Sequence, residues 1–197
     1  MSERKYDRLL GIKTVGIREL DESEHHRYEA TPYEALDKLF ESYAFKETDR
    51  VVDFGCGRGR SLFYIHHHFH IPVRGIEAND KTFSEAIENK LSYRHRKEHI
   101  RAPISIEYGL AEHYQIQKED NTFYFFNPFS IHIFKKVVHN IVQSYKQEKR
   151  RIELIFYYPL PEIKKFMKMK TPFTLLNKIR VPGVHGKYGK FLIYRLE

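Results

Sequence analysis

The sequence predicts an α/β fold in which a mostly parallel sheet is covered by helices on both faces and finished by an antiparallel hairpin. Three observations support this prediction. Short apolar segments alternate with segments of helical periodicity from residue 50 to residue 170. A glycine-rich loop follows the first apolar segment. Near the carboxyl end, two extended segments are joined by a loop that contains several glycines and shows no helical pattern.

Composition and patterning indicate one domain without a membrane segment. The 197 residues suit a single domain over residues 1–197, and the one cysteine, Cys56, excludes a disulfide within the chain. Residues 1–7 are polar and lack a signal-peptide pattern, and no segment approaches the roughly 20 apolar residues that span a bilayer. We therefore expect a cytoplasmic protein with no membrane partner. The sequence leaves the number of subunits open.

The charge balance favours anionic partners. Lys and Arg number 34 against 26 Asp and Glu, which gives a net charge of +8. Such a chain suits a partner such as nucleic acid, although a basic protein that is merely soluble has the same composition. Several basic residues near the carboxyl end could either steer a nucleic acid or form a solvated helix face. They are Lys164, Lys165, Lys168, Lys170, Lys178 and Arg180.

The amino-terminal part of the domain is divided into two segments. Residues 1–27 are polar and weakly patterned, and we expect them to form an arm or a lid. Residues 28–48 contain a predicted helix that runs to about Tyr43. We expect the Thr31 hydroxyl and the Glu34 carboxylate to cap this helix reciprocally, with Pro32 at its first position. Residues 49–197 form the predicted core.

The core elements follow from apolar periodicity. Residues 123–126 are aromatic on both faces, so we expect this strand to be buried on both faces. The aromatic pairs Phe125-Phe126 and Tyr157-Tyr158 are interpreted as core, and Asp80 is expected to cap its helix. The predicted order is a strand at 50–54, a helix at 61–70, a strand at 72–76, a helix from 80, strands at 104–108 and 123–126, a helix at 131–145, a strand at 152–158, a short helix around 163–167, and extended segments at 173–181 and 190–196.

The glycine-rich loop lies between a strand and a helix, which is typical of a nucleotide site, because glycines let the backbone approach a ligand closely. Its glycines are evenly spaced at Gly55, Gly57 and Gly59, and position 60 is Arg60. The NAD-binding pattern Gly-x-Gly-x-x-Gly does not fit this spacing. With Asp53 two positions before the first glycine, the loop resembles motif I of the class I S-adenosylmethionine-dependent methyltransferases.

This resemblance covers about residues 27–196 and implies a seven-stranded, Rossmann-like class I methyltransferase fold with S-adenosyl-L-methionine as cofactor. It implies that the loop backbone lines the cofactor and that Asp53 orients the loop or the amino-acid moiety. We interpret Cys56 as a small packing residue. The cofactor-binding residues implied for the loop are Asp53, Phe54, Gly55, Cys56, Gly57, Arg58 and Gly59.

Further cofactor contacts are expected after the next strands. Glu77 ends the second strand, where a carboxylate can accept hydrogen bonds from both ribose hydroxyls, and Ala78 follows it. Leu110 stands where many relatives have an aspartate, so we expect apolar contact with the adenine from Leu110 and backbone contact near Ala111.

The segment before the first helix resembles the part of relatives that folds over the methionine end of the cofactor. Tyr28 and Thr31 are the candidates there, and the alternative for Thr31 is a purely capping role.

Asn127, Pro128 and Phe129 end the fourth strand, at the place of motif IV, and are the candidate catalytic residues. In amine-methylating relatives this motif accepts the hydrogens of the target nitrogen and stacks on a planar target. Phe129 either provides that stacking ring or is a core residue, with Asn127 touching only the cofactor. The resulting hypothesis is a methyltransferase, preferably for a nitrogen of RNA, protein or a small molecule. The alternative is a catalytically silent adenosylmethionine-binding protein.

Four histidines between residues 66 and 70 invite a metal hypothesis. His66 and His70 are one helical turn apart, a spacing that can bind zinc. The sequence has no neighbouring cysteine and no His-Glu-x-x-His pattern. We therefore expect a solvated helix face and no metal.

Overall fold

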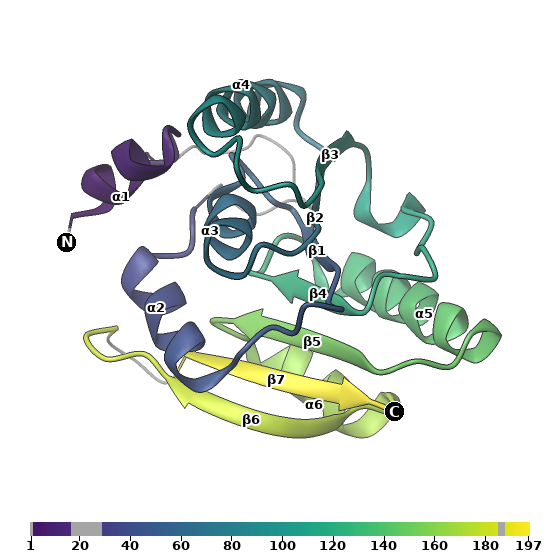
Figure 1. Ribbon diagram of the computed structural model, residues 1–197. Helices are drawn as coiled ribbons and strands as arrows, with labels where there is room; N and C mark the ends of the chain where they lie inside the picture. Colours follow the sequence, from purple (N-terminus) through teal and green to yellow (C-terminus); the bar gives the residue numbers. More distant parts are fainter. Residues whose placement is uncertain (1, 17–28, 185–187) are drawn as a thin grey trace.

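A seven-stranded sheet forms the centre of the computed structural model, which describes residues 2–16, 29–184 and 188–197. The strand order is β3-β2-β1-β4-β5-β7-β6 (Figure 1). Only β7 runs against its neighbours, β5 and β6, so the sheet is mostly parallel and finished by an antiparallel hairpin, as the sequence predicted. The strands are β1 (Val51–Phe54), β2 (Val73–Glu77), β3 (Ile104–Tyr108), β4 (Thr122–Phe125), β5 (Ile152–Tyr157), β6 (Thr174–Arg180) and β7 (Lys190–Leu196).

Helices cover both faces of the sheet, and each face has its own apolar core. The core of one face draws on α1 (Glu3–Leu10), α2 (Tyr33–Ser42), α3 (Arg60–Phe69) and α4 (Asp80–Arg96). The core of the other face draws on the short 3₁₀ helix η1 (Ala111–His113), α5 (Ile131–Gln147) and α6 (Pro161–Lys170). None of the helices in the described ranges is long and apolar enough to cross a membrane.

Strand β4 lies in the middle of the sheet and contributes to both cores. Phe123 and Phe125 point into the core beneath α5, and Tyr124 points into the core beneath α3. Phe125 stacks on Phe156 of β5 with ring centroids 5.0 Å apart. The strand predicted at residues 123–126 is β4, and all four residues of β4 are buried, as expected for a strand covered on both faces; Phe126 lies just beyond it and is half-buried.

The helix starts differ from the expected caps. Pro32 is the N-cap of α2, and no side-chain cap of Thr31 with Glu34 forms. The Thr31 hydroxyl instead shares a 2.8 Å hydrogen bond with the Tyr124 hydroxyl, while Glu3 accepts from the Tyr33 amide at 3.1 Å. Tertiary partners thus replace the local capping box.

The cap of helix α4 lies one residue earlier than expected. Asn79 is the N-cap and accepts a 2.9 Å hydrogen bond from the Thr82 amide, so Asp80 is the first helical residue and not the cap. An acidic residue in the first turn still suits the positive end of the helix dipole.

Helix α1 lies inside the segment for which the sequence predicted a polar arm or lid. Residues 3–10 form this helix, and residues 17–28 lie outside the described part of the chain. Asp7 is buried and accepts hydrogen bonds from the Thr14 amide at 2.6 Å, the Thr14 hydroxyl at 2.7 Å and the Tyr33 hydroxyl at 2.7 Å. A buried carboxylate therefore anchors this segment. Because the anchoring residues are polar, no apolar pattern in the sequence predicts a packed helix here.

The histidine-rich helix face is not uniformly solvated. His66 is fully buried, and its two ring nitrogens lie 2.7 Å from the Tyr93 hydroxyl and 3.0 Å from the Ala102 carbonyl oxygen. Burial lowers the pKa of His66 to about 4. The expectation of a solvated face is therefore wrong for His66, which is a hydrogen-bonded core residue.

An ion cluster joins the first residues of β5 to the end of β7. The Glu153 side chain is completely buried and accepts hydrogen bonds from the Tyr43 hydroxyl and from Arg195, the latter at 2.8 Å. Arg151 lies 3.6 Å from the same carboxylate and also pairs with the buried Asp49. Buried charges of this kind depend on their partners, because desolvation of an unpaired ion costs several kcal/mol.

Glu153→Ala is expected to lower the free energy of unfolding by about 3–5 kcal/mol, because Arg151 and Arg195 lose a buried counter-ion. Urea unfolding followed by circular dichroism measures this change. Glu119→Ala, which removes the exposed ion pair with Lys118, is the control and should change the free energy by less than about 1 kcal/mol. Equal effects of the two substitutions would contradict the prediction.

Candidate functional site

The glycine loop lies where β1 ends and α3 begins, and all three of its glycines have positive φ angles, so none can be replaced without strain. Gly55 and Gly59 have φ angles of 72° and 86°, in the left-handed region. A Cβ at Gly55 would lie 2.3 Å from the Pro128 Cβ, and one at Gly59 would lie 2.6 Å from the Phe63 ring. The loop, which we call the glycine cradle, can therefore lie this close to Pro128 and Phe63 only because it has no side chains at these positions.

Glu77 borders this cradle at the end of β2. One carboxylate oxygen accepts from the Gly57 amide at 2.8 Å, and the other accepts from the Asn79 amide at 2.9 Å. The side chain is only 8% exposed, and the Glu77 carbonyl accepts a 3.0 Å hydrogen bond from the Gly109 amide. Glu77 therefore links the glycine loop to the carboxyl end of β3. Ala78, which follows it, is half-buried.

Two large apolar side chains are exposed beside Glu77. Tyr108 is 60% exposed and Leu110 is 38% exposed, and they flank Gly109. Ala111 begins η1 and is buried. An apolar surface next to a carboxylate fits a ligand that joins a planar ring to a hydroxyl-bearing group.

Asp53 lies beneath the loop and is almost completely buried. The carboxylate is buried and accepts a hydrogen bond from the Ser61 hydroxyl in the first turn of α3. Burial, reinforced by the nearby charge of Glu77, raises the pKa of Asp53 to about 7 although the Ser61 bond acts in the opposite direction. Asp53 is thus placed to position the loop through Ser61.

Three other loop residues that were predicted to bind the cofactor, Phe54, Cys56 and Arg58, make contacts within the protein itself. Phe54 is buried in the core beneath α5, and Cys56 packs so closely on β2 that a Cβ at Gly75 would lie 2.5 Å from its sulfur. Burial raises the pKa of the Cys56 thiol well above its usual range, which agrees with a packing role. The Arg58 guanidinium turns outward to Glu85 at 2.7 Å and to the Val15 carbonyl at 3.2 Å.

Arg60, for which the sequence suggested no role, joins the amino-terminal segment to the loop. Its buried guanidinium donates to the Thr14 hydroxyl at 2.7 Å and to the Thr31 carbonyl at 3.2 Å, and it pairs with Glu3. It also lies 4.5 Å above the Tyr33 ring centroid. An arginine directly after a glycine loop was the only sequence signal for this contact.

Thr31 is brought to the loop although it caps no helix. It lines a small hollow of about 30 Å³ together with Asp53, Gly55, Arg60 and Tyr124. The second candidate from this part of the chain, Tyr28, lies outside the described residues.

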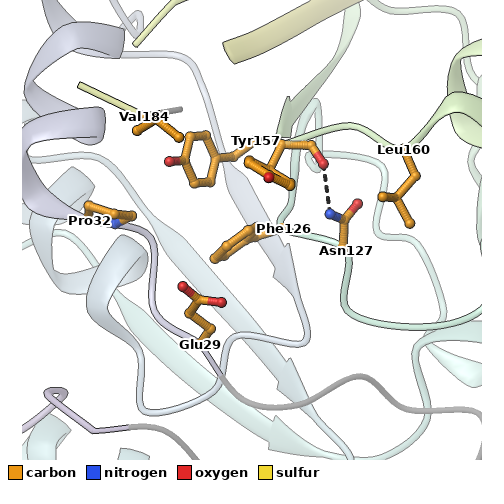
Figure 2. Close-up of a pocket in the computed structure, with 8 residues that line it drawn as sticks. Glu29, Pro32, Phe126, Asn127, Tyr157, Leu160 and Val184 are labelled. Atoms are coloured by element: carbon orange, nitrogen blue, oxygen red, sulfur yellow. Dashed lines mark hydrogen bonds between the residues drawn. The ribbon is translucent and has the colours of Figure 1, made fainter. Parts of the chain in front are cut away.

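A larger cavity opens at the carboxyl ends of β4 and β5 (Figure 2). Its volume is about 550 Å³, within the usual range for ligand sites. Three aromatic rings, an amide and a carboxylate dominate its lining. The lining residues are Glu29, Pro32, Phe126, Asn127, Tyr157, Tyr158, Leu160 and Val184.

Asn127 and Tyr158 are held in this cavity by a shared hydrogen bond. The Asn127 side-chain nitrogen donates to the Tyr158 carbonyl at 2.7 Å, and Figure 2 marks this bond. Because a carbonyl can only accept, the bond fixes the amide orientation and leaves Oδ1 as the acceptor that Asn127 offers to a ligand. Both residues have positive φ angles, 41° and 52°, which non-glycine residues adopt rarely and often at functional sites.

The aromatic rings that line the cavity do not include Phe129, the ring that the sequence suggested for stacking on a target. Phe129 is buried and contacts Phe125 edge-on at 6.5 Å, so it is a core residue, the second of the two alternatives. Phe126 and Tyr158 are half-buried and line the cavity, which corrects their interpretation as core. The sequence signal for a cavity-lining role was their position at the ends of strands, next to Asn127 and Pro159.

Comparison with known proteins shows the fold. No family model and no curated protein matches the chain. A Pyrococcus horikoshii protein thought to be an RNA methyltransferase has a TM-score of 0.60 at 15% identity, over 98% of this chain and 97% of that one. An RNA methyltransferase from Salinibacter ruber, solved with S-adenosyl-L-homocysteine, has a TM-score of 0.57 at 16% identity, over 85% and 92%.

A third structure is an uncharacterized protein from Listeria monocytogenes serotype 4b, with a TM-score of 0.56 at 10% identity. The match covers 81% of this chain and spans 65% of the Listeria protein. At these identities the similarity concerns the fold alone. The chain has the Rossmann-like class I methyltransferase fold that the sequence predicted.

The raised pKa of Asp53 predicts a specific pH dependence of stability. The folded state keeps the Asp53 proton up to about pH 7, whereas an unfolded chain releases it near pH 4. The free energy of unfolding should therefore fall, relative to that of Asp53→Asn, as the pH rises through this window, and the difference should be constant above it. Denaturant titrations at several pH values measure it. A pH-independent difference for Asp53→Asn would contradict the assignment.

Proposed function

We propose that this chain is an S-adenosylmethionine-dependent methyltransferase that acts on an acceptor nitrogen. One observation carries the proposal: at Gly55 the glycine cradle lies against Pro128, the residue that follows Asn127 of the aromatic cavity. Asn127 directly precedes Pro128, so a methyl donor in the cradle and an acceptor in the cavity would be neighbours.

The residues around the cradle suit adenosylmethionine. The Glu77 carboxylate is placed to accept charge-assisted hydrogen bonds from ribose hydroxyls, and the Leu110 side chain with the backbone near Ala111 would border the adenine. The left-handed glycines let the amino-acid part approach the backbone. The S-adenosyl-L-homocysteine in the Salinibacter ruber structure, which has the same fold, supports this choice.

The cofactor would supply a methyl group on a positively charged sulfur. The nitrogen lone pair would form the new bond, the carbon–sulfur bond would break with its electrons staying on sulfur, and the methylated nitrogen would release its proton to solvent. Asn127 Oδ1 would accept an N–H of the acceptor and direct its lone pair. The bond to Tyr158 keeps that oxygen in place, while the rings of Phe126 and Tyr157 would hold a planar group and exclude water. The contribution of these residues is positioning.

The positioning residues described above are compatible with an acceptor nitrogen in RNA, in a protein or in a small molecule. The two neighbours described as RNA methyltransferases support RNA, and the net charge of +8 suits a nucleic acid. A silent adenosylmethionine-binding protein is the alternative. A cytoplasmic location is part of the proposal, supported by the single, buried Cys56, which has no disulfide partner in the sequence.

Calorimetric titration tests the cofactor. Adenosylmethionine and adenosylhomocysteine should bind, and NAD should not. Glu77→Ala should weaken both interactions by about 1–3 kcal/mol, the cost of leaving hydrogen-bonding groups unpaired. Glu88→Ala, at an exposed carboxylate of α4, is the matched control and should leave the affinities unchanged. Binding of NAD alone would refute the cofactor assignment, and an unchanged affinity in Glu77→Ala would refute the ribose contact.

Transfer of a labelled methyl group from adenosylmethionine to fractions of a cell lysate separates an active enzyme from a silent one. Mass spectrometry of the labelled product should locate the methyl group on nitrogen. Asn127→Gly, which tolerates the positive φ, should reduce transfer about 100-fold because the acceptor loses its orientation.

The affinity of Asn127→Gly for adenosylhomocysteine should stay within about threefold of wild type, a change worth less than 1 kcal/mol. Undiminished transfer would exclude the proposed role of Asn127. A wild-type protein that labels no fraction would favour the silent alternative.

A further inference from the structure

A continuous path of aromatic rings leads out of the cavity. The ring centroids of Phe126 and Tyr157 are 4.8 Å apart, those of Tyr157 and Tyr158 are 6.2 Å apart, and those of Tyr158 and Tyr188 are 5.6 Å apart. The path ends at α6, where the Lys164 ammonium lies 5.4 Å from the Tyr188 ring centroid. Aromatic surface therefore extends beyond the space that an acceptor group would fill.

The backbone holds the middle of this path in place. Tyr158 keeps a positive φ because its carbonyl accepts from Asn127 and its amide donates to the Lys190 carbonyl at 3.0 Å. This conformation costs free energy, so the contacts on both sides maintain the position of Tyr158. The path is thus a fixed feature of the cavity wall.

The chemistry changes along the path. Its inner end offers acceptors for N–H groups, the Asn127 Oδ1 and the Glu29 carboxylate. Its outer end carries positive charge, Lys164 together with the exposed Lys165 and Lys168 of α6. A ligand that fits both ends presents N–H groups on a flat ring and carries negative charge farther out.

We infer that the methyl acceptor is a base within a single-stranded nucleic acid. The target base would enter the cavity against the half-buried ring of Phe126, and the adjoining nucleotide would contact Tyr188 with its phosphate near Lys164. Bases stack on aromatic side chains whatever their sequence, and lysines contribute salt-dependent phosphate contacts. The inference rests on the proposed methyltransferase function and names its substrate class.

A lysine side chain of a protein is the competing acceptor, and the charges oppose it. The cavity holds the carboxylate of Glu29, but the route to it passes Lys164 and the lysines of α6. A basic peptide would meet like charges along this route, whereas a polynucleotide would meet opposite ones.

Fluorescence anisotropy with labelled single strands of about twelve nucleotides, one RNA and one DNA, tests the inference in the presence of adenosylhomocysteine. Tyr188→Ala should weaken binding about tenfold, and Tyr188→Phe, which keeps the ring, should restore it. Lys164→Ala should reduce the slope of log Kd against log salt concentration by about 0.7.

The chain offers a matched control for both substitutions. Tyr145 near the end of α5 also has a lysine over its ring, with the Lys149 ammonium 4.0 Å from the centroid. Its hydroxyl donates to the carbonyl of Glu197, the residue after β7, and therefore lies at the edge of the sheet opposite to the cavity. Tyr145→Ala and Lys149→Ala should change the affinity for either strand by less than about twofold.

Each outcome has a defined meaning. Loss of affinity confined to Tyr188→Ala and Lys164→Ala supports the inference, and the ratio of RNA to DNA affinity identifies the sugar. Failure of both strands to bind while adenosylhomocysteine still binds overturns the inference and leaves the proposed methyltransferase intact. The same holds if free nucleosides bind as tightly as the strands, or if a basic peptide is methylated instead. Failure of adenosylhomocysteine itself to bind overturns the proposed function, and the inference with it.

Discussion

The contact between Gly55 and Pro128 determines how the two halves of the site face each other. The end of β4 can approach the loop after β1 this closely only because residue 55 has no side chain. This approach places Asn127 beside the glycine loop and directs the chain onward to Phe129, whose burial under α5 fixes the turn. A bulkier residue at position 55 would therefore disturb both the loop and the cavity.

Polar side chains hold the amino-terminal segment against this site. Asp7 and Arg60 are both buried, and Thr14 donates to the first and accepts from the second. Groups of this kind add little net stability, but each becomes costly when its partner is lost. Helix α1 is thus attached by contacts that specify one position, and that position brings Thr31 to the small hollow at the loop and Glu29 to the cavity.

Apolar periodicity was sufficient to predict the sheet, because strands buried on both faces and amphipathic helices leave a local pattern. The glycine spacing and the position of Glu77 at the end of the next strand are also local patterns, and they were sufficient to locate the cradle. Long-range polar contacts leave no such pattern. Thr31 has the sequence of a helix cap but bonds to Tyr124, 93 residues away, and His66 has the sequence of a surface residue but bonds to Tyr93. The aromatic lining of the cavity was not predicted, because Phe126 and Tyr158 are residue types that usually lie in a core. Their rings are exposed to the cavity only because the chain turns at the ends of their strands.

The reversed strand β7 has a consequence for how such a protein can diversify. Because β6 and β7 form a hairpin, the connection between them returns to the same edge of the sheet as the glycine loop, and Val184 and Tyr188 reach the aromatic cavity from it. The cradle beside β1, β2 and β3 is built from residues 53–111, far away in the chain. Insertions, deletions or exchanges in the last hairpin can therefore reshape the aromatic cavity while the glycine cradle stays unchanged. A lineage can alter the shape of this cavity by changing one peripheral connection, without altering the loop between β1 and α3.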